Sequence, residues 1–150
     1  MPDTATPPSG ELDWLISAFA EENPYVEQAA VVSSDGVLLA HSTRDGSTRG
    51  ADLAAITCGI AALALGCSEI TGGGDVRRTL VDLENGCLLL YALGEGALLA
   101  VHAADGCDLA LLGYQSSRLA RRAGVALTPA PRAGLPLPRR ALPALPRGTQ

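Results

Sequence analysis

Apolar residues near the start of the chain recur with the spacing of one helix face. This spacing predicts an amphipathic helix over residues 11–23, with a stripe made of Leu12, Leu15, Ile16 and Phe19. Acidic residues in the first turn suit the positive end of the helix dipole. Asn23-Pro24 ends the helix, because a residue before proline resists helical geometry.

Two short apolar runs follow within residues 27–42, separated by Ser34-Asp35-Gly36. An Asp-Gly pair between such runs predicts a β-hairpin. Three further strands are predicted at 76–84, 87–93 and 97–103, with turns at Asn85-Gly86 and at Gly94-Glu95-Gly96.

The last three strands differ in polarity. Those at 87–93 and 97–103 are apolar on both faces, so layers must cover both sides of the sheet. The strand at 76–84 carries charge on both faces, which is typical of an edge strand or of one that pairs with a second chain; the residues are Arg77, Arg78, Asp82 and Glu84.

Residues 51–70 form a long run that is apolar nearly all round. Only 16 uncharged residues, Leu53 to Ser68, lie between Asp52 and Glu69, short of the ~20 that span a membrane. We therefore expect a buried helix of a soluble domain and no transmembrane segment. Glycine inside a helix costs about 1 kcal/mol relative to alanine, so Gly59 and Gly66 indicate close approach by another backbone.

A last helix is predicted over 108–124, with Arg118, Arg121 and Arg122 in its final turns and Gly124 as its C-cap; Leu109, Leu112, Leu119 and Ala123 line its apolar side. The fold class is therefore α/β (α+β), in the order αββαβββα, with a five-stranded, mainly antiparallel sheet and helices on both faces. The domain spans 10–128, after a disordered lead (1–9) and before a proline- and arginine-rich disordered tail (129–150).

Charge and cysteine content narrow the function. The tail holds four of the 11 basic residues and no acid, which leaves seven arginines against 16 acids in the remainder. An acidic body is a poor match for nucleic acid, whose binding depends on neutralising phosphates. The four cysteines contain no C-x-x-C pair, which favours core thiols over a zinc site. The acidic, proline-bearing N-terminus does not resemble a secretory signal, so we expect a cytoplasmic protein with reduced thiols.

The stretch "EITGGGDVRRT" at 69–79 tests for nucleotide binding. A P-loop needs a lysine, and the chain has none; a Rossmann loop follows a strand and opens a helix, the reverse of the order here. Gly72-Gly73-Gly74 is therefore read as a helix stop and turn. His102 lies in an apolar strand and is read as a hydrogen-bonded sheet histidine. We predict no catalytic residue, cofactor site or metal site.

Four stretches together resemble the Roadblock/dynein-light-chain domain: "LDWLISAFAEENPYVEQAAVVSSDGVLLAHS", "ADLAAITCGIAALALG", "GGGDVRRTLVDLENGCLLLYAL" and "DLALLGYQSSRLARRAG". The resemblance covers about residues 10–128 and is greatest to bacterial members encoded beside a Ras-like GTPase. It implies a homodimer in which the third strands of two protomers pair and the second helices pack together. The implied dimer-facing residues are Ile56, Gly59, Ile60, Leu63, Arg78, Leu80 and Asp82. The alternative is that the second helix is buried within its own subunit.

The resemblance also implies the partner. Roadblock proteins act on small GTPases as scaffolds, regulators or activating subunits, so we expect a non-enzymatic dimer that binds a Ras-like small GTPase and modulates its nucleotide cycle or localisation. Candidate GTPase contacts are Arg44, Arg49 and Arg77. A more specific hypothesis is that Arg77 or Arg78 acts as an arginine finger, which is worth ~10³–10⁵ in the rate of GTP hydrolysis.

Two alternatives stay open. One is a pure adaptor that links a sensor kinase-like protein to other operon products without affecting GTP hydrolysis. In that case the tail captures partners. The basic tail can also pair with the acidic body of its own chain or with an anionic membrane surface, which would place the protein peripherally at a membrane. The other is a small-molecule sensor, which only the general likeness of such sheets to sensory domains supports.

Overall fold

The computed structural model describes residues 9–46 and 48–128, so the predicted tail and all but the last residue of the predicted lead lie outside the described residues. The chain forms three α-helices, five strands and one short 3-10 helix within these ranges. They are α1 (Ser9–Glu22), β1 (Val26–Val32), β2 (Leu38–Thr43), α2 (Gly50–Thr71), β3 (Arg78–Leu83), β4 (Gly86–Ala92), η1 (Gly94–Gly96), β5 (Leu98–Ala103) and α3 (Leu109–Leu127).

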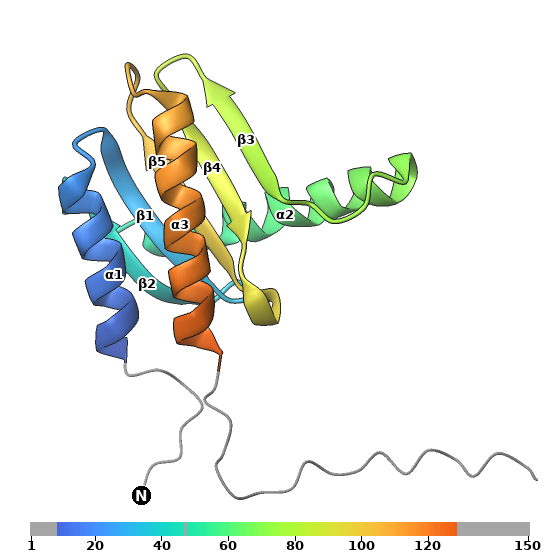
Figure 1. The fold of residues 1–150 in the computed structure, drawn as a ribbon, viewed down its shortest axis with the longest axis horizontal. Coiled ribbons are helices and arrows are strands. Elements are labelled where there is room, and N and C mark those ends of the chain that lie inside the picture. The colour runs from blue at the N-terminus through green and yellow to red at the C-terminus, as the bar shows by residue number, and fades with distance from the viewer. Residues whose placement is uncertain (1–8, 47, 129–150) are drawn as a thin grey trace, which may run out of the picture.

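The strands form one sheet in the order β2-β1-β5-β4-β3, and all four neighbouring pairs are antiparallel. Helices α1 and α3 lie side by side on one face, and α2 lies on the other (Figure 1). This confirms the predicted fold class, including the edge position of the strand at 76–84.

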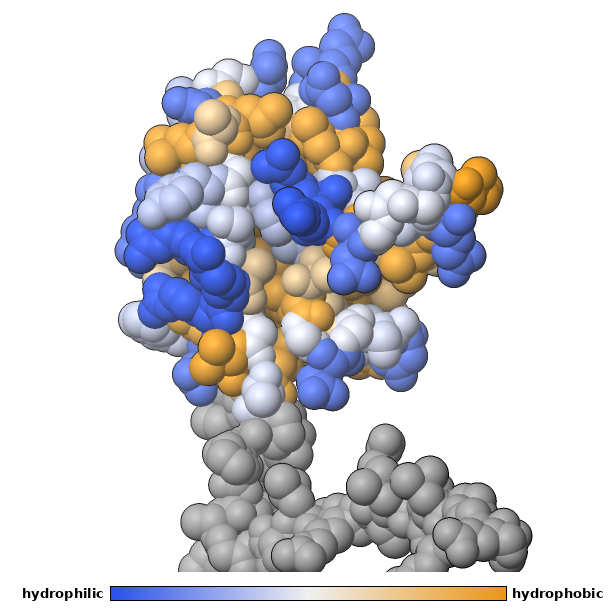
Figure 2. Space-filling view, turned by 45° about the vertical axis from the view of Figure 1, so that its right-hand side comes forward, coloured by the Kyte–Doolittle hydropathy of each residue, from blue (hydrophilic) through white to orange (hydrophobic). Residues whose placement is uncertain are grey.

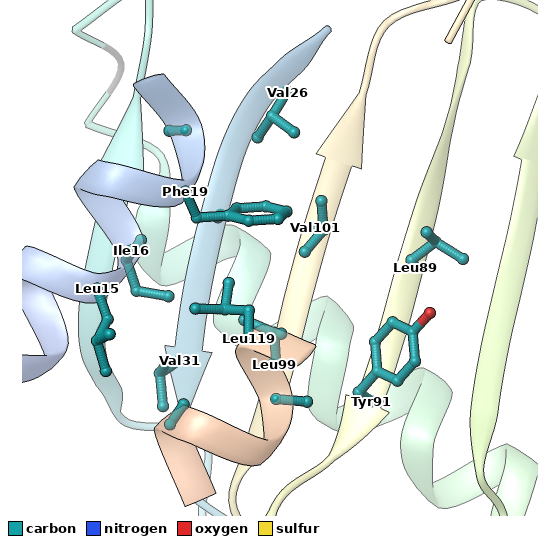
Figure 3. Packing of buried hydrophobic residues seen from close by; sticks show 14 of the residues in the cluster. Leu15, Ile16, Phe19, Val26, Val31, Leu89, Tyr91, Leu99, Val101 and Leu119 are labelled. Carbon is teal, nitrogen blue, oxygen red and sulfur yellow. The ribbon is translucent and has the colours of Figure 1, made fainter. Parts of the chain in front are cut away.

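The larger hydrophobic core lies between the sheet and the pair α1 and α3. Phe19 from α1 and Leu119 from α3 meet Val101 and Leu99 on β5, and Tyr91 extends this layer onto β4 (Figure 3). All four residues of the predicted α1 stripe are buried here. Apolar burial is worth roughly 25 cal/mol per Å², so this layer holds the described domain together.

Local sequence signals set most element ends as predicted. Gly36 adopts a positive φ of 87° in the hairpin turn, where its amide donates to the Ser33 carbonyl at 3.0 Å. Gly72 caps α2 in the left-handed conformation with φ of 66°, and its amide donates to the Ser68 carbonyl. The glycine run is thus the helix stop that its position after an apolar helix indicated.

Two predictions for the last helix are wrong. Gly124 does not cap α3: the helix continues to Leu127, and Thr128 caps it by donating to the Gly124 carbonyl at 2.8 Å. The arginines therefore lie before the last turn. Leu109 is exposed rather than core-facing, because it opens the helix beyond the edge of the packed layer.

Arg44 joins three segments that are distant in sequence. Its guanidinium donates to the backbone carbonyls of Ala20, Asn23 and Val26, with 2.7 Å to Asn23. Hydrogen bonds from a charged donor are about twice as strong as neutral ones. Arg44 therefore fixes the end of α1 and the start of β1 against the end of β2.

Gly86 is the turn residue that no other residue type can replace without strain. Its φ is 133°, and a Cβ there would lie 2.3 Å from the Ala103 carbonyl oxygen on β5. We expect Gly86→Ala to lower the free energy of unfolding by at least about 2 kcal/mol, because a strained φ alone costs about 1–3 kcal/mol.

The matched control is Gly94→Ala, where no atom lies within 4 Å of the added methyl group. Urea unfolding at one protein concentration measures both variants, and the control should change by less than about 0.5 kcal/mol. Equal losses in the two variants would contradict this account of Gly86.

Candidate functional site

Helix α2 has two unlike parts. Its buried residues all fall in the first eight positions of the helix: Gly50, Leu53, Ala54 and Thr57. They pack on the second hydrophobic cluster, which includes Ala30, Val32 and Ala100 of the sheet. Beyond this part, α2 crosses behind the sheet and extends past the edge strand β3 (Figure 1).

The rest of α2 presents large apolar side chains to solvent. Leu63 is 77% exposed, Ile70 is 88% exposed and Leu65 is more than half exposed. Ile56, on the outward side of the first part of the helix, is also more than half exposed. The prediction of a buried helix is therefore wrong within one chain, because the sheet ends before α2 does. Contiguous exposed apolar surface of this kind marks an interaction site.

Among the described residues, α2 is also the one helix that is long and apolar enough to cross a membrane by length and composition. A helix that other protein surfaces cover meets the same test. Its first part packs on the sheet of its own domain.

Strand β3 forms a second exposed feature next to α2, an edge with unpaired backbone hydrogen-bonding groups. Within the described part of the chain it pairs with β4 alone, so its outer edge presents unpaired backbone groups. Such an edge is a template for another strand. The register places Arg78, Leu80 and Asp82 opposite Tyr91, Leu89 and Cys87, on the sheet face that carries α1 and α3.

The predicted dimer-facing residues divide by burial. Ile56, Gly59 and Leu63 of α2 are exposed, and so are Arg78, Leu80 and Asp82 of β3. Ile60 differs, because it is half-buried against the second hydrophobic cluster. The side chains of the strand candidates therefore point to the sheet face opposite α2, and the backbone edge of β3 adjoins the protruding part of the helix.

A wide groove of about 1230 Å³ lies between the protruding part of α2, strand β3 and helix α3. Figure 2, in which this side comes forward, shows apolar and hydrophilic patches alternating over the protruding part of α2 and the hollow beside it. Arg77 and Arg78 both line the groove, together with Cys67, Thr71 and Tyr114. Cys67 is exposed here, which corrects its prediction as a core thiol.

Arg78 lies over α3 because Gly113 leaves room for it. A Cβ at Gly113 would come within 3.3 Å of the Arg78 Nη1. The Tyr91 hydroxyl donates to the Gly113 carbonyl at 3.0 Å and fixes β4 against α3 at the same point. The floor of the groove is therefore held by a hydrogen bond between β4 and α3, whereas Arg77 and Arg78 are exposed.

The three candidate GTPase contacts do not lie together in one chain. Arg44 is engaged in the three carbonyl hydrogen bonds described above. Arg49 precedes α2 and pairs with Asp52 at 3.3 Å. Both adjoin the β2 side of the sheet, whereas Arg77 lines the groove at the opposite edge beside β3.

No three metal-binding side chains gather in residues 9–46 and 48–128. His41 Nε2 lies 3.2 Å from the Gln28 Oε1. The buried Nδ1 of His102 has no hydrogen-bond partner in the described part, which corrects its prediction as a hydrogen-bonded histidine. Burial raises the pKa of the Cys87 thiol, and the neighbouring Cys107 adds to the shift, so Cys87 is a poor nucleophile.

Some exposed residues beside these surfaces were missed at the sequence level. Leu65 and Ile70 belong to the same apolar run as the predicted helix residues, and the absence of a polar face on that helix was the signal. Tyr114 had no such signal, because a single aromatic residue in an amphipathic helix is as compatible with core as with surface.

Comparison with known proteins gives a consistent result. The Roadblock/LC7 domain profile matches residues 12–103. A Roadblock/LC7 domain from Streptomyces avermitilis is 31% identical, with a TM-score of 0.71 over 77% of this chain and 96% of that chain. Comparison with curated protein sequences gives no match.

Two more distant structures share the fold. Myxococcus xanthus MglB is 14% identical, with a TM-score of 0.70 over 77% of this chain and 93% of that chain. An MglB described with a tetrameric arrangement is 17% identical, with a TM-score of 0.73 over 79% of this chain and 89% of that chain. The profile covers more than half of the chain and the fold agrees, so the chain belongs to the Roadblock/LC7 domain family.

Proposed function

We propose that this protein is a homodimeric regulator that binds a Ras-like small GTPase and modulates its nucleotide cycle or its localisation, in the cytoplasm. One observation supports the dimer: the exposed apolar part of α2 and the unpaired edge of β3 lie on the same side of the domain. A second copy related by a two-fold axis covers both surfaces with the same patch. An MglB of this fold has been described in a tetrameric arrangement, so assembly occurs among proteins of similar structure.

The proposal of a GTPase partner rests on family membership and on the surface beside the proposed dimer face. Roadblock proteins act with small GTPases, as the resemblance implies, and the groove beside β3 presents two exposed arginines, Arg77 and Arg78. Arginine is enriched in protein interfaces and can stabilise the charge that develops on a transferred phosphoryl group. Arg77 and Arg78 are therefore the candidates for contact with the GTPase.

Introducing a charge on α2 tests whether this helix forms the dimer contact. Leu63→Glu places a carboxylate in the proposed α2–α2 contact, and a buried unpaired charge there should cost more than 2 kcal/mol, as loss of a hot spot does. We expect the dimer Kd to rise at least about 30-fold. Sedimentation then reports about 15.3 kDa instead of twice that mass.

Val125→Glu is the matched control, because Val125 on α3 is 76% exposed against 77% for Leu63. This variant should remain dimeric. Dissociation by both substitutions, or by neither, would contradict the assignment of α2 as the dimer face.

GTP hydrolysis by a Ras-like small GTPase from the same genome tests the regulatory role. We expect the protein to bind the GTPase and to change its turnover. If Arg77 or Arg78 acts as an arginine finger, its substitution by alanine should lower stimulated hydrolysis by ~10³–10⁵ and leave binding intact. Arg121→Ala on α3 is the control, since Arg121 is exposed and lies outside the lining of the groove.

Each result of this assay has one interpretation. A change in the rate of GTP turnover supports the proposed regulatory role. Binding without a change in turnover favours the adaptor that links the GTPase to another component, such as a sensor kinase-like protein. No binding to the GTP or GDP form rejects the GTPase partner.

A further inference from the structure

The α1–α3 groove is a second surface feature, on the sheet face opposite α2 (Figure 1). We use this name for two adjoining cavities along the seam between the helices, of about 200 Å³ and about 190 Å³. Both are lined by Glu22, Asn23 and Gln115, so they adjoin one another along the seam. The proposed dimer leaves this face free.

Aromatic side chains stand along the groove. Trp14 lines one cavity although it is 62% exposed, and Tyr25 lines the other and is half exposed. Arg118 lies 5.9 Å above the ring centre of the neighbouring Tyr114, which holds that guanidinium on the α3 side. Large exposed aromatic side chains beside a groove favour a ligand that stacks on them.

We propose that residues 129–150 of the same chain dock in the α1–α3 groove in an extended conformation. This proposal does not depend on the GTPase partner. Three independent features support it: the reach of the segment, its proline content and its charge.

Reach is sufficient by a wide margin. Helix α3 ends at Leu127 at the same end of the seam where α1 begins (Figure 1). A polyproline II helix of 22 residues, the number from 129 to 150, spans about 68 Å at about 3.1 Å per residue. The 19 residues of α3 cover only about 28 Å at 1.5 Å per residue. The segment can therefore turn back and follow the whole groove.

The amino-acid composition of residues 129–150 suits binding to a groove lined by aromatic side chains. The segment contains six prolines, among them Pro136, Pro138, Pro143 and Pro146. Proline-rich segments dock on aromatic-lined grooves because a polyproline II helix loses little conformational entropy when it binds. Trp14 offers the largest aromatic surface for this packing.

Charge sets the orientation of the segment. Among the four acids of α1, Glu22 lines the groove, and Asp108 lines its second cavity. Residues 129–150 carry four arginines and no acid. Arg118 and Arg122 line the α3 wall of the groove and repel these arginines, so the arginines of the segment face Glu22 and Asp108. Exposed ion pairs contribute at most about 1 kcal/mol each, so packing on Trp14 supplies much of the affinity.

Trp14 is the only tryptophan in the chain, so its fluorescence reports on the groove directly. We compare acrylamide quenching in the full chain with quenching in a full-length variant that has Arg132, Arg139, Arg140 and Arg147 all changed to Glu. The acrylamide quenching constant should rise about twofold or more in the variant, because a segment bound for more than half of the time shields the indole for that fraction.

Two single substitutions supply the matched pair. Glu22 lines both cavities, whereas Glu21, the same residue type one position earlier, lines neither. Glu22→Gln should raise the quenching constant of Trp14, and Glu21→Gln should leave it unchanged. An equal effect of the two would show general charge attraction and would overturn docking in the groove.

The Leu63→Glu background, which separates the protomers of the proposed dimer, tests whether the docked segment comes from the same protomer or from its partner. Shielding of Trp14 should persist there, because the segment belongs to the same chain. Loss of shielding in that background would assign the segment to the neighbouring copy. Equal quenching of the full chain and the charge-reversed variant would reject docking and leave the groove for another protein.

Discussion

The structure depends on one mismatch, between the length of α2 and the width of the sheet beneath it. Residues 50–57 of the helix pack on the second hydrophobic cluster, and the rest continues past β3 with Leu63 and Ile70 in solvent. Exposed apolar area costs roughly 25 cal/mol per Å² relative to burial. The single domain therefore leaves a large stabilising contribution unused, and in the proposed dimer a second copy supplies the missing surface.

The two faces of the sheet consequently have different roles. Helices α1 and α3 complete a buried layer on one face, with Arg44 and the Tyr91–Gly113 hydrogen bond fixing its margins. On the α2 face, apolar side chains of the helix remain exposed, and the arginine-lined groove opens beside them. Stability comes mainly from the face covered by α1 and α3, and in the proposed dimer the α2 face supplies association. A partner that binds near β3 thus meets a surface whose position the proposed dimer determines.

The sequence predicted the fold well because its signals are local. The α1 stripe, the Asp-Gly hairpin and the glycine stop after α2 each follow from a few neighbouring residues. The errors concern packing at a distance: Leu109 and Cys67 are apolar yet exposed, and α2 is apolar yet mostly uncovered. Periodicity shows that a helix is apolar but not which surface covers it. The separation of Arg44 and Arg49 from Arg77 likewise depends on strand order, which no local pattern encodes.

Hydrogen exchange of the β3 backbone amides tests the central claim most directly. Amides of β3 that point away from β4 have no partner within the described chain. If two copies join through α2 and β3, these amides should exchange slowly at concentrations well above the dimer Kd and rapidly well below it. Rapid exchange of the same amides at every concentration would contradict the account.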